Sequence, residues 1–234
     1  MPFRFKQFIV DDAGCPMKVG TDSVLLGAWA KLENSRRILD IGTGCGLLAL
    51  MAAQRSEAQI TAIDIDPVVV ETAMANFGKS SWADTLEARC VSLQDFLTTQ
   101  RDGSFDHIIS NPPFFINSLK APDPERSNAR HNDLLPFEDL AFASAKLLAP
   151  DGRLSLVLPV AEGYLFIDIA AKTGLFLVRK LTVIPKAGKE ANRLLLEFAR
   201  QQMPMENSEL TIRNESGEYT NEYKKLTSLF YLDF

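Results

Sequence analysis

The stretch that decides the fold is ILDIGTGCG, residues 38–46, and an apolar helical pattern follows it at residues 47–55. Residues 38–41 form a short apolar run, which is typical of a buried strand. Gly42, Gly44 and Gly46 then separate this strand from the helix. Glycine adopts backbone conformations that other residues avoid, so a glycine turn in this position lets the backbone approach a ligand closely. The stretch therefore predicts a strand, a ligand-binding loop and a helix.

Strand and helix patterns continue to alternate after this loop. The predicted strands lie at residues 59–66, 86–93, 105–110 and 153–158, and the predicted helices at residues 67–77 and 137–148. Such alternation predicts an α/β fold, with a mostly parallel sheet that carries helices on both faces and binds ligands at the carboxyl ends of its strands. Two further strand patterns, at residues 175–185 and 193–200, predict an antiparallel hairpin at the edge of the sheet.

The two flanks of this alternating region have patterns of their own. Residues 3–19 alternate loosely around turn-forming residues and predict a β-hairpin, and residues 21–32 have helical spacing. We expect residues 1–34 to form an extension that packs on a core of residues 35–234. The segment 203–234 is rich in aromatic residues, so we expect it to dock rather than to remain a free tail.

Composition narrows the functional classes. With 46% hydrophobic and 24% charged residues, the 234-residue chain is an ordinary globular protein and not a disordered one. The net charge of −5 argues against a surface coated in positive charge. Three cysteines without a CxxC pair, and two histidines, provide neither a disulfide framework nor a metal site. No secretory signal or membrane-spanning run is visible, so we expect a cytoplasmic protein.

Acidic residues around the glycine loop indicate the kind of ligand. The third glycine comes one residue too early for the dinucleotide pattern GxGxxG, which disfavours NAD. Asp40 would repel a pyrophosphate but suits a ligand that carries an amino group. Asp64 ends the next strand, where a carboxylate can accept both hydroxyl groups of a ribose. Asp66 precedes Pro67 and is more simply a helix N-cap. Together these residues predict an adenosine-bearing ligand with a cationic group.

The loop Asn111-Pro112-Pro113-Phe114, after the strand at residues 105–110, is the most specific signal in the chain. Two adjacent prolines remove two backbone donors, which leaves carbonyl oxygens without local partners. A planar amine must pyramidalise before it can attack a methyl group. Hydrogen bonds from its two hydrogens to the Asn111 side-chain oxygen and the Pro112 carbonyl would favour that geometry, and Phe114 would stack the base. The loop therefore predicts methylation of an amine without a covalent intermediate.

The glycine loop and the Asn-Pro-Pro-Phe loop resemble those of the S-adenosylmethionine-dependent methyltransferases with a seven-stranded Rossmann-like sheet, and of their amino-methylating members in particular. The resemblance implies that the glycine loop holds the methionine part of the cofactor, Asp64 the ribose and Asp95 the adenine amino group. The residues that would hold the cofactor are Lys18, Thr21, Asp22, Asp40, Gly42, Gly44, Gly46, Asp64, Ile65, Asp95, Phe96 and Asn111.

Basic residues near the predicted site suggest a nucleic-acid substrate. The connection at residues 115–135 is long for a compact domain, which favours a functional lid. Residues 172–200 carry seven basic and two acidic side chains, a balance of +5, and are a candidate phosphate-contacting surface. The candidate RNA contacts in these two segments are Arg126, Arg130, His131, Lys186, Lys189 and Arg193.

Four segments together are similar to a narrower family, the bacterial tRNA(Val)-specific adenine-37 N6-methyltransferases. They are FRFKQF at 3–8, KVGTDSVLLGAW at 18–29, NPPFF at 111–115 and YTNEY at 219–223. The resemblance runs nearly end to end. It implies an enzyme that binds S-adenosylmethionine and the anticodon stem-loop of a tRNA. We expect a monomer, with neither a metal nor a membrane as partner.

Three alternatives remain open from the sequence. The acceptor could instead be guanine N2 of ribosomal RNA or a glutamine amide of a protein, because the Asn-Pro-Pro-Phe loop names the acceptor atom and not the substrate. A cofactor-binding module without catalysis, such as an RNA chaperone, is the alternative from another class. The intact Asn111 and Phe114 favour an enzyme over that module.

Overall fold

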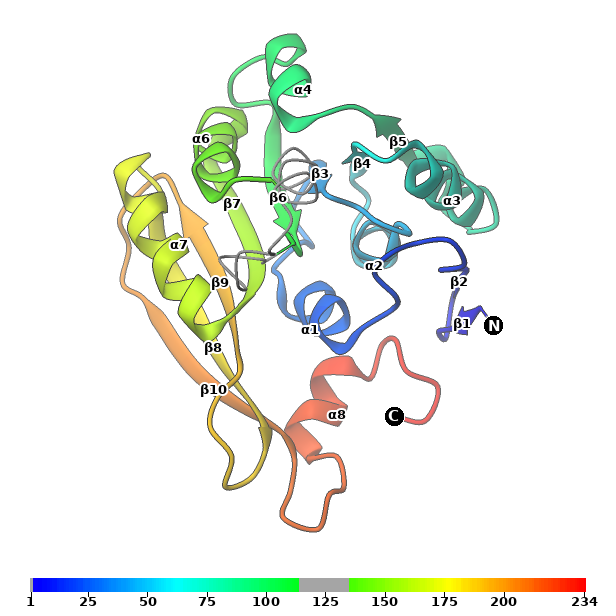
Figure 1. The fold of residues 1–234 in the computed structure, drawn as a ribbon, viewed down its shortest axis with the longest axis vertical. Coiled ribbons are helices and arrows are strands. Elements are labelled where there is room, and N and C mark those ends of the chain that lie inside the picture. The colour runs from blue at the N-terminus through cyan, green and yellow to red at the C-terminus, as the bar shows by residue number, and fades with distance from the viewer. Residues whose placement is uncertain (1, 114–134) are drawn as a thin grey trace, which may run out of the picture.

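The computed structural model describes residues 2–113 and 135–234. Its centre is an eight-stranded sheet in the order β10-β8-β9-β7-β6-β3-β4-β5 (Figure 1). The strands are β3 (Arg37–Ile41), β4 (Gln59–Asp64), β5 (Leu86–Cys90), β6 (Phe105–Ser110), β7 (Leu148–Pro159), β8 (Phe176–Lys186), β9 (Arg193–Ala199) and β10 (Glu206–Arg213). Strand β9 runs antiparallel to both of its neighbours, and every other pair in the sheet is parallel.

Helices cover both faces of the sheet (Figure 1). They are α1 (Thr21–Trp29), α2 (Leu47–Arg55), α3 (Pro67–Gly78), α4 (Leu93–Thr99), α6 (Phe137–Leu147), α7 (Val160–Lys172) and α8 (Asn221–Thr227), with a 3-10 turn η1 (Ala83–Thr85). Two clusters of buried side chains match the two faces. One contains residues of α1, α2, α3 and α8, and the other contains residues of α4, α6 and α7. Neighbouring residues of β3 alternate between them, since Ile38 belongs to the first and Leu39 to the second.

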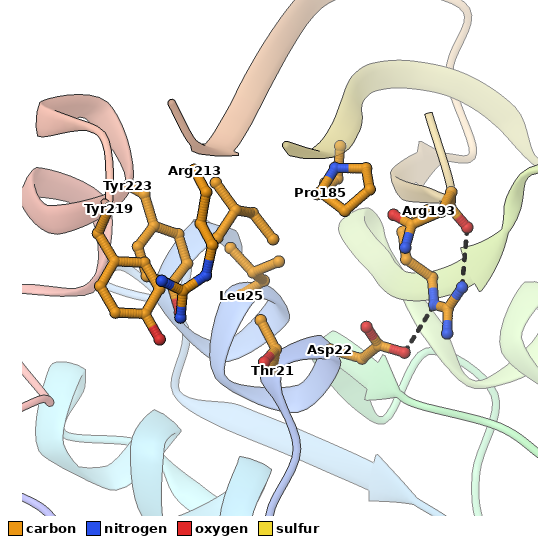
Figure 2. A pocket seen from close by; sticks show the side chains of 11 residues that line it. Thr21, Asp22, Leu25, Pro185, Arg193, Arg213, Tyr219 and Tyr223 are labelled. Carbon is orange, nitrogen blue, oxygen red and sulfur yellow. Dashed lines mark hydrogen bonds and ion pairs between the residues drawn. The ribbon is translucent and has the colours of Figure 1, made fainter. Parts of the chain in front are cut away.

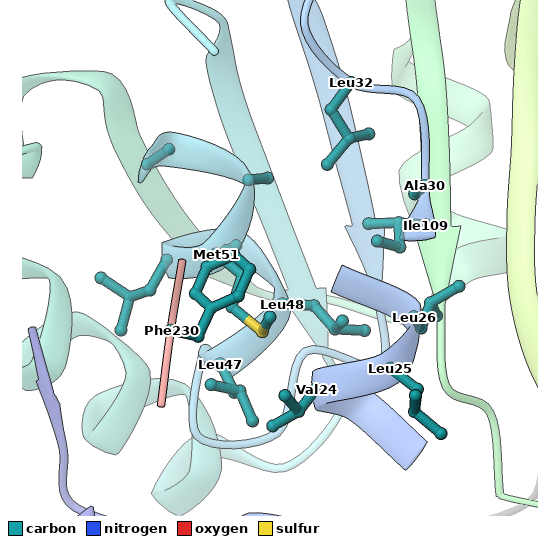
Figure 3. Packing of buried hydrophobic residues seen from close by; sticks show 14 of the residues in the cluster. Val24, Leu25, Leu26, Ala30, Leu32, Leu47, Leu48, Met51, Ile109 and Phe230 are labelled. Atoms are coloured by element: carbon teal, nitrogen blue, oxygen red, sulfur yellow. The ribbon is translucent and has the colours of Figure 1, made fainter. Parts of the chain in front are cut away.

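The first cluster is shown in Figure 3, where side chains of α1 and α2 meet Phe230 from the C-terminal segment. Phe230 is fully buried. The same segment contacts the N-terminal hairpin of β1 (Phe3–Arg4) and β2 (Ile9–Val10), because the Lys6 backbone N–H donates to the Phe230 carbonyl at 2.9 Å. The N-terminal hairpin is present but shorter than predicted: its strands pair within residues 3–10, with the turn at residues 5–8, and residues 11–19 form no strand. The segment 203–234 docks on the body of the protein, as predicted.

The fold class agrees with the sequence prediction, including the antiparallel hairpin of β8 and β9. The sheet has one more strand than the seven predicted, because β10 pairs in parallel with β8 and extends the sheet beyond the hairpin. The strand predicted at residues 86–93 ends at Cys90, since the Ser92 hydroxyl caps the following helix by accepting from the Asp95 backbone N–H at 3.0 Å. Asp66 caps α3 as predicted and accepts from the Val68 backbone N–H at 2.9 Å.

No helix within residues 2–113 and 135–234 is long and apolar enough to cross a membrane.

Candidate active site

The predicted site residues gather at one edge of the sheet because β6, β3, β4 and β5 are parallel neighbours. Their carboxyl ends carry the glycine loop, Asp64, the start of α4 and Asn111. Strands β8 and β10 run in the same direction as β7, so they also end at this edge. The basic end of the β8–β9 hairpin therefore lies on the same side of the molecule as the predicted cofactor and acceptor residues.

The glycine loop has the backbone conformation that its sequence predicts. Gly42, Gly44 and Gly46 have φ angles of 70°, 57° and 83°, in the left-handed region that favours glycine. A Cβ atom built on Gly42 or Gly44 would meet nothing within 4 Å, whereas one on Gly46 would lie 2.5 Å from Cε1 of Phe77. The first two glycines therefore leave space beside the backbone for a ligand, and the third lets α2 begin close to α3.

Asp40 lies beneath this loop and is completely buried. The Thr43 hydroxyl donates to its Oδ2 at 2.6 Å, while Oδ1 has no hydrogen-bond partner in the described part of the chain. Burial, with a smaller contribution from the charge of Asp64, raises the pKa of Asp40 from 3.8 to about 7. A buried carboxyl group with one oxygen that accepts no hydrogen bond from the described residues fits the prediction of a ligand with a cationic amino group at this loop.

Asp64 ends β4 and is held against the glycine loop. Its Oδ2 accepts from the Gly44 backbone N–H at 3.1 Å, and its Oδ1 accepts from the Asp66 backbone N–H at 3.2 Å. These bonds fix the carboxylate at the end of its strand while the side chain stays partly accessible. The next residue, Ile65, is 49% exposed. Both residues thus face the edge where the ribose of an adenosine is predicted to bind.

Asn111 follows β6 directly and is buried. Its Nδ2 donates to the hydroxyl of Ser23 on α1 at 2.9 Å, and this bond orients the side-chain amide. The Oδ1 atom is buried and has no hydrogen-bond partner among the described residues. Pro112 is buried and Pro113 is half-buried. The structure thus contains a fixed, unpartnered amide oxygen where the sequence predicts an acceptor for an amine hydrogen.

Three other predicted cofactor residues, Lys18, Asp95 and Phe96, make their contacts away from the glycine loop. Lys18 is exposed and donates to the Asp12 carbonyl at 2.6 Å. Asp95 is exposed at the start of α4, where it accepts from the Ser92 hydroxyl at 2.7 Å. Phe96 is buried in the core beside Phe105, so its ring contributes to packing.

Thr21 and Asp22 open α1, next to the site. Thr21 is exposed, and Asp22 accepts from Nε of Arg193 at 2.7 Å. This ion pair joins a predicted cofactor residue to a predicted RNA-contacting one, although the two lie 171 positions apart in the chain. The structure therefore brings the two predicted functions to one place.

Of the predicted RNA contacts, three lie on or beside the β8–β9 hairpin. Lys186 ends β8 and is half-buried, Lys189 is exposed in the turn, and Arg193 begins β9. The other three, Arg126, Arg130 and His131, lie outside the described residues, as does the predicted catalytic residue Phe114.

A pocket beside α1 contains functional candidates that the sequence analysis missed (Figure 2). Arg213 ends β10, and its guanidinium lies over the ring of Tyr219, 3.9 Å from the ring centroid. Tyr223 stacks on Tyr219 with a centroid distance of 5.0 Å. The two tyrosines belong to the YTNEY segment, but no pattern in the sequence indicates that they stand beside Arg213.

Within the described ranges, no group of three or more histidine, cysteine or acidic side chains is placed to hold a metal ion. A cofactor with an amino acid part and a ribose fits the features that the site does have. They are the buried Asp40, whose Oδ1 has no hydrogen-bond partner among the described residues, the open space beside Gly42 and Gly44, and Asp64 at the end of its strand.

Comparisons with known proteins agree with this arrangement. Residues 17–167 match the family model described as "Methyltransferase small domain". A Bacteroides fragilis protein named tRNA1(Val) (adenine(37)-N6)-methyltransferase is 43% identical over 230 residues, which cover 98% of this chain and 97% of that protein. A Shewanella baltica protein of the same name is 44% identical over 238 residues, which cover 100% of each.

Among solved structures, an Agrobacterium tumefaciens protein described as a predicted O-methyltransferase superposes with a TM-score of 0.70 and 19% identity, over 89% of this chain and 96% of that one. This likeness concerns the fold alone. The two full-length relatives, together with the family model, decide the assignment: the chain belongs to the methyltransferase small domain family and, within it, to the tRNA1(Val) (adenine(37)-N6)-methyltransferases.

Proposed function

We propose that this protein transfers a methyl group from S-adenosylmethionine to the exocyclic N6 of the adenine at position 37 in the anticodon loop of tRNA-Val. Membership of the family supports the reaction and the substrate class. The observation that carries the chemistry is the buried Oδ1 of Asn111, which has no hydrogen-bond partner among the described residues.

In the proposed reaction, Asn111 acts on the amine that receives the methyl group. Its Oδ1 accepts one amine hydrogen and the Pro112 carbonyl accepts the other, which favours the pyramidal nitrogen of the transition state. The Ser23 hydroxyl holds Asn111 Nδ2 at 2.9 Å, so that Oδ1 is already aimed when the base arrives. An unpaired adenine of an anticodon loop can reach such a buried acceptor at lower cost than a base inside a duplex.

The cofactor would be held by the glycine loop and Asp64. When bound, S-adenosylmethionine would supply the methyl group: its bond to the cationic sulfur would break as the bond to N6 forms, without a covalent enzyme intermediate, leaving S-adenosylhomocysteine. The N6 nitrogen would release one proton to solvent. The open space beside Gly42 and Gly44 suits the amino acid part, Asp64 suits the ribose hydroxyls, and the buried carboxyl of Asp40 favours the positive amino group nearby. Lys18, Thr21, Asp22, Ile65, Asp95 and Phe96 complete the proposed cofactor contacts, with Phe96 shaping the pocket through its packing.

The RNA would lie along the edge of the sheet that holds Asn111 and the β8–β9 hairpin. Lys186, Lys189 and Arg193 supply positive charge there, and we place Arg126, Arg130 and His131 among the RNA contacts as well. All of these groups come from one chain, so we further propose that the protein works as a monomer in the cytoplasm, where tRNA is modified.

The test is transfer of labelled methyl groups to two synthetic anticodon stem-loops, one with adenine and one with guanine 3′ of the anticodon. Incorporation into the adenine stem-loop alone, recovered as N6-methyladenosine, is the expected result. Incorporation into guanine, or into a protein glutamine amide and neither stem-loop, would replace adenine by one of the two alternative acceptors.

Replacement of Asn111 separates an enzyme from a binding module. Asn111→Ala should lower kcat about 10²- to 10³-fold, as the loss of one transition-state hydrogen bond does, while the Kd for S-adenosylmethionine changes little. The matched control is Asn207→Ala, which changes an exposed asparagine on β10 and should leave both quantities unchanged. A chain whose turnover survives Asn111→Ala does not use the proposed mechanism.

A further inference from the structure

The pocket of Figure 2 lies at the carboxyl edge of the sheet, and neither Asn111 nor Pro112 lines it. It has a volume of about 260 Å³ and is formed by the start of α1, the ends of β8 and β10, and α8. This volume is just below the range of about 300–1,000 Å³ that is typical of ligand pockets. The pocket is therefore of a size for one small planar group rather than for an extended ligand.

One wall of the pocket is a flat cationic surface. Arg213 lies over Tyr219 at 3.9 Å, and its Nη1 donates to the Gly217 carbonyl at 2.6 Å, so two contacts fix the guanidinium plane. Tyr223 stacks behind Tyr219 and is buried. In the described part of the chain no carboxylate forms an ion pair with Arg213. A fixed guanidinium plane without a protein anion is a surface on which nucleobases stack.

The opposite wall adds a second arginine and an apolar ring. Figure 2 shows Pro185 and Arg193 across the pocket from Arg213, with Leu25 between the two walls. Asp22 accepts from Nε of Arg193 at 2.7 Å and holds that guanidinium at the rim. A planar base can thus meet a cationic plane on one side, an apolar residue below and the ion-paired guanidinium of Arg193 at the rim.

The pocket is joined to the acceptor site through two adjacent residues of α1. Asp22 bonds to Arg193 in the pocket, and Ser23 bonds to Asn111 in the acceptor site. A group bound in the pocket therefore sits one residue along α1 from the contact that orients the catalytic amide.

We propose that this pocket binds one unpaired nucleotide of the RNA substrate that flanks the methylated adenine, with its base stacked on Arg213. The inference rests on the proposed function and adds to it a specificity subsite. Arg213 is then a residue that reads the flanking position, and the Asp22–Arg193 pair sets the distance between this nucleotide and Asn111.

The experiment measures the affinity of fluorescently labelled anticodon stem-loops by anisotropy, without cofactor, so that it does not depend on methyl transfer. The stem-loops are the intact adenine-containing one and a set in which each nucleotide next to the adenine is made abasic in turn. The variants are Arg213→Gln and Arg213→Lys, of which the second keeps the charge but not the stacking plane. The control is Arg101→Gln, which removes an exposed arginine on the loop before β6, at the opposite edge of the sheet.

The proposal expects Arg213→Gln and Arg213→Lys to weaken binding of the intact stem-loop roughly tenfold, within the range for losing one stacked base, while Arg101→Gln binds as the parent protein does. One abasic stem-loop should show the same loss with the parent protein and no further loss with either Arg213 variant. Circular dichroism spectra that match those of the parent protein confirm that the variants are folded.

Equal affinity of the parent protein and the Arg213 variants for the intact stem-loop would overturn the proposal. So would losses that simply multiply for every abasic position, because Arg213 would then not contact any of the missing bases. The methyl-transfer assay with the same RNAs decides the proposed function separately. A chain that methylates the adenine but shows no coupling between Arg213 and a flanking base keeps its function and loses this subsite.

Discussion

Replacing Asp40 by asparagine should flatten the pH dependence of stability of the cofactor-free protein. Burial raises the pKa of this carboxyl group from 3.8 to about 7, with a further contribution from the charge of Asp64. A carboxyl group whose pKa is raised by folding stabilises the protein fully below its unfolded pKa, and this stabilisation is lost as the pH rises through about 7. Asparagine does not titrate, so the variant lacks this dependence.

The magnitude follows from the pKa. Between pH 8 and pH 5 the buried carboxyl group spans about two pH units of linkage, each worth about 1.4 kcal/mol. The free energy of unfolding of the parent protein should therefore gain roughly 3 kcal/mol from Asp40 over this interval. Burial lowers the pKa of His107 to about 3, so this residue works in the opposite direction, but it is present in both proteins and cancels in the comparison.

The assay is urea unfolding followed by the fluorescence of Trp29 and Trp82, at pH 5 and pH 8. The quantity compared is the gain in unfolding free energy when the pH is lowered from 8 to 5. This gain should be about 3 kcal/mol smaller in Asp40→Asn than in the parent protein. Asp84→Asn, at an exposed position in η1, is the control and should match the parent. A pH dependence of Asp40→Asn within about 0.5 kcal/mol of the parent would refute the reasoning.

Three further predictions concern other parts of the site. Gly46→Ala should lower the free energy of unfolding by roughly 3 kcal/mol in urea unfolding, because φ is +83° and the new Cβ would lie 2.5 Å from Cε1 of Phe77. Gly42→Ala, with no atom within 4 Å of the new Cβ, should lower the free energy of unfolding by only about 1–2 kcal/mol, through the backbone strain that alanine introduces at a positive φ. Equal losses in the two variants would contradict the packing argument. Ser23→Ala should lower kcat about tenfold without changing the Kd for S-adenosylmethionine, because Asn111 Nδ2 loses its acceptor. Ser23→Thr keeps the hydroxyl and should retain most of the rate. A loss of rate in both variants would point to helix packing instead. Cys90 is exposed, whereas burial raises the pKa of Cys45 to about 12. Cys90→Ser should therefore abolish the fast reaction of the protein with a thiol reagent. A fast reaction that persists in this variant would mean that a buried thiol becomes accessible.

The central part of the fold could be predicted because its signals are local. The glycine loop, the Asp66-Pro67 cap and the apolar runs of β3, β4 and β6 each specify their own element within a few residues. Asn111 could be singled out as a candidate for the same reason, since the adjacent prolines mark its loop. Where a short stretch of residues specifies its own conformation, that conformation can be predicted from the sequence.

Strand β10 could not be predicted because it is specified by pairing with a distant segment and not by a local sequence pattern. Of its eight residues only Leu210 is buried, so the strand lacks an apolar pattern and is fixed by its pairing with β8. The same pairing places Arg213 opposite Lys186 at the end of the sheet, next to Tyr219. The Asp22–Arg193 contact likewise depends on the whole sheet having formed. The part of the candidate site that the sequence did not predict is thus the part formed by contacts between distant segments.

The contact between the first and last segments of the described chain has a consequence for folding during synthesis. Lys6 donates to the Ser228 carbonyl across a separation of 222 residues, and the ring of Phe5 stacks on Tyr231. Contacts so distant in sequence form late, because the chain between them must first be ordered. Residues 5 and 6 leave the ribosome well before residues 228–231, yet their contacts with that segment are among the last to form. Until residues 228–231 emerge, the ring of Phe5 lacks its contact with Tyr231, and exposed aromatic surface of this kind makes an incompletely folded chain prone to aggregation.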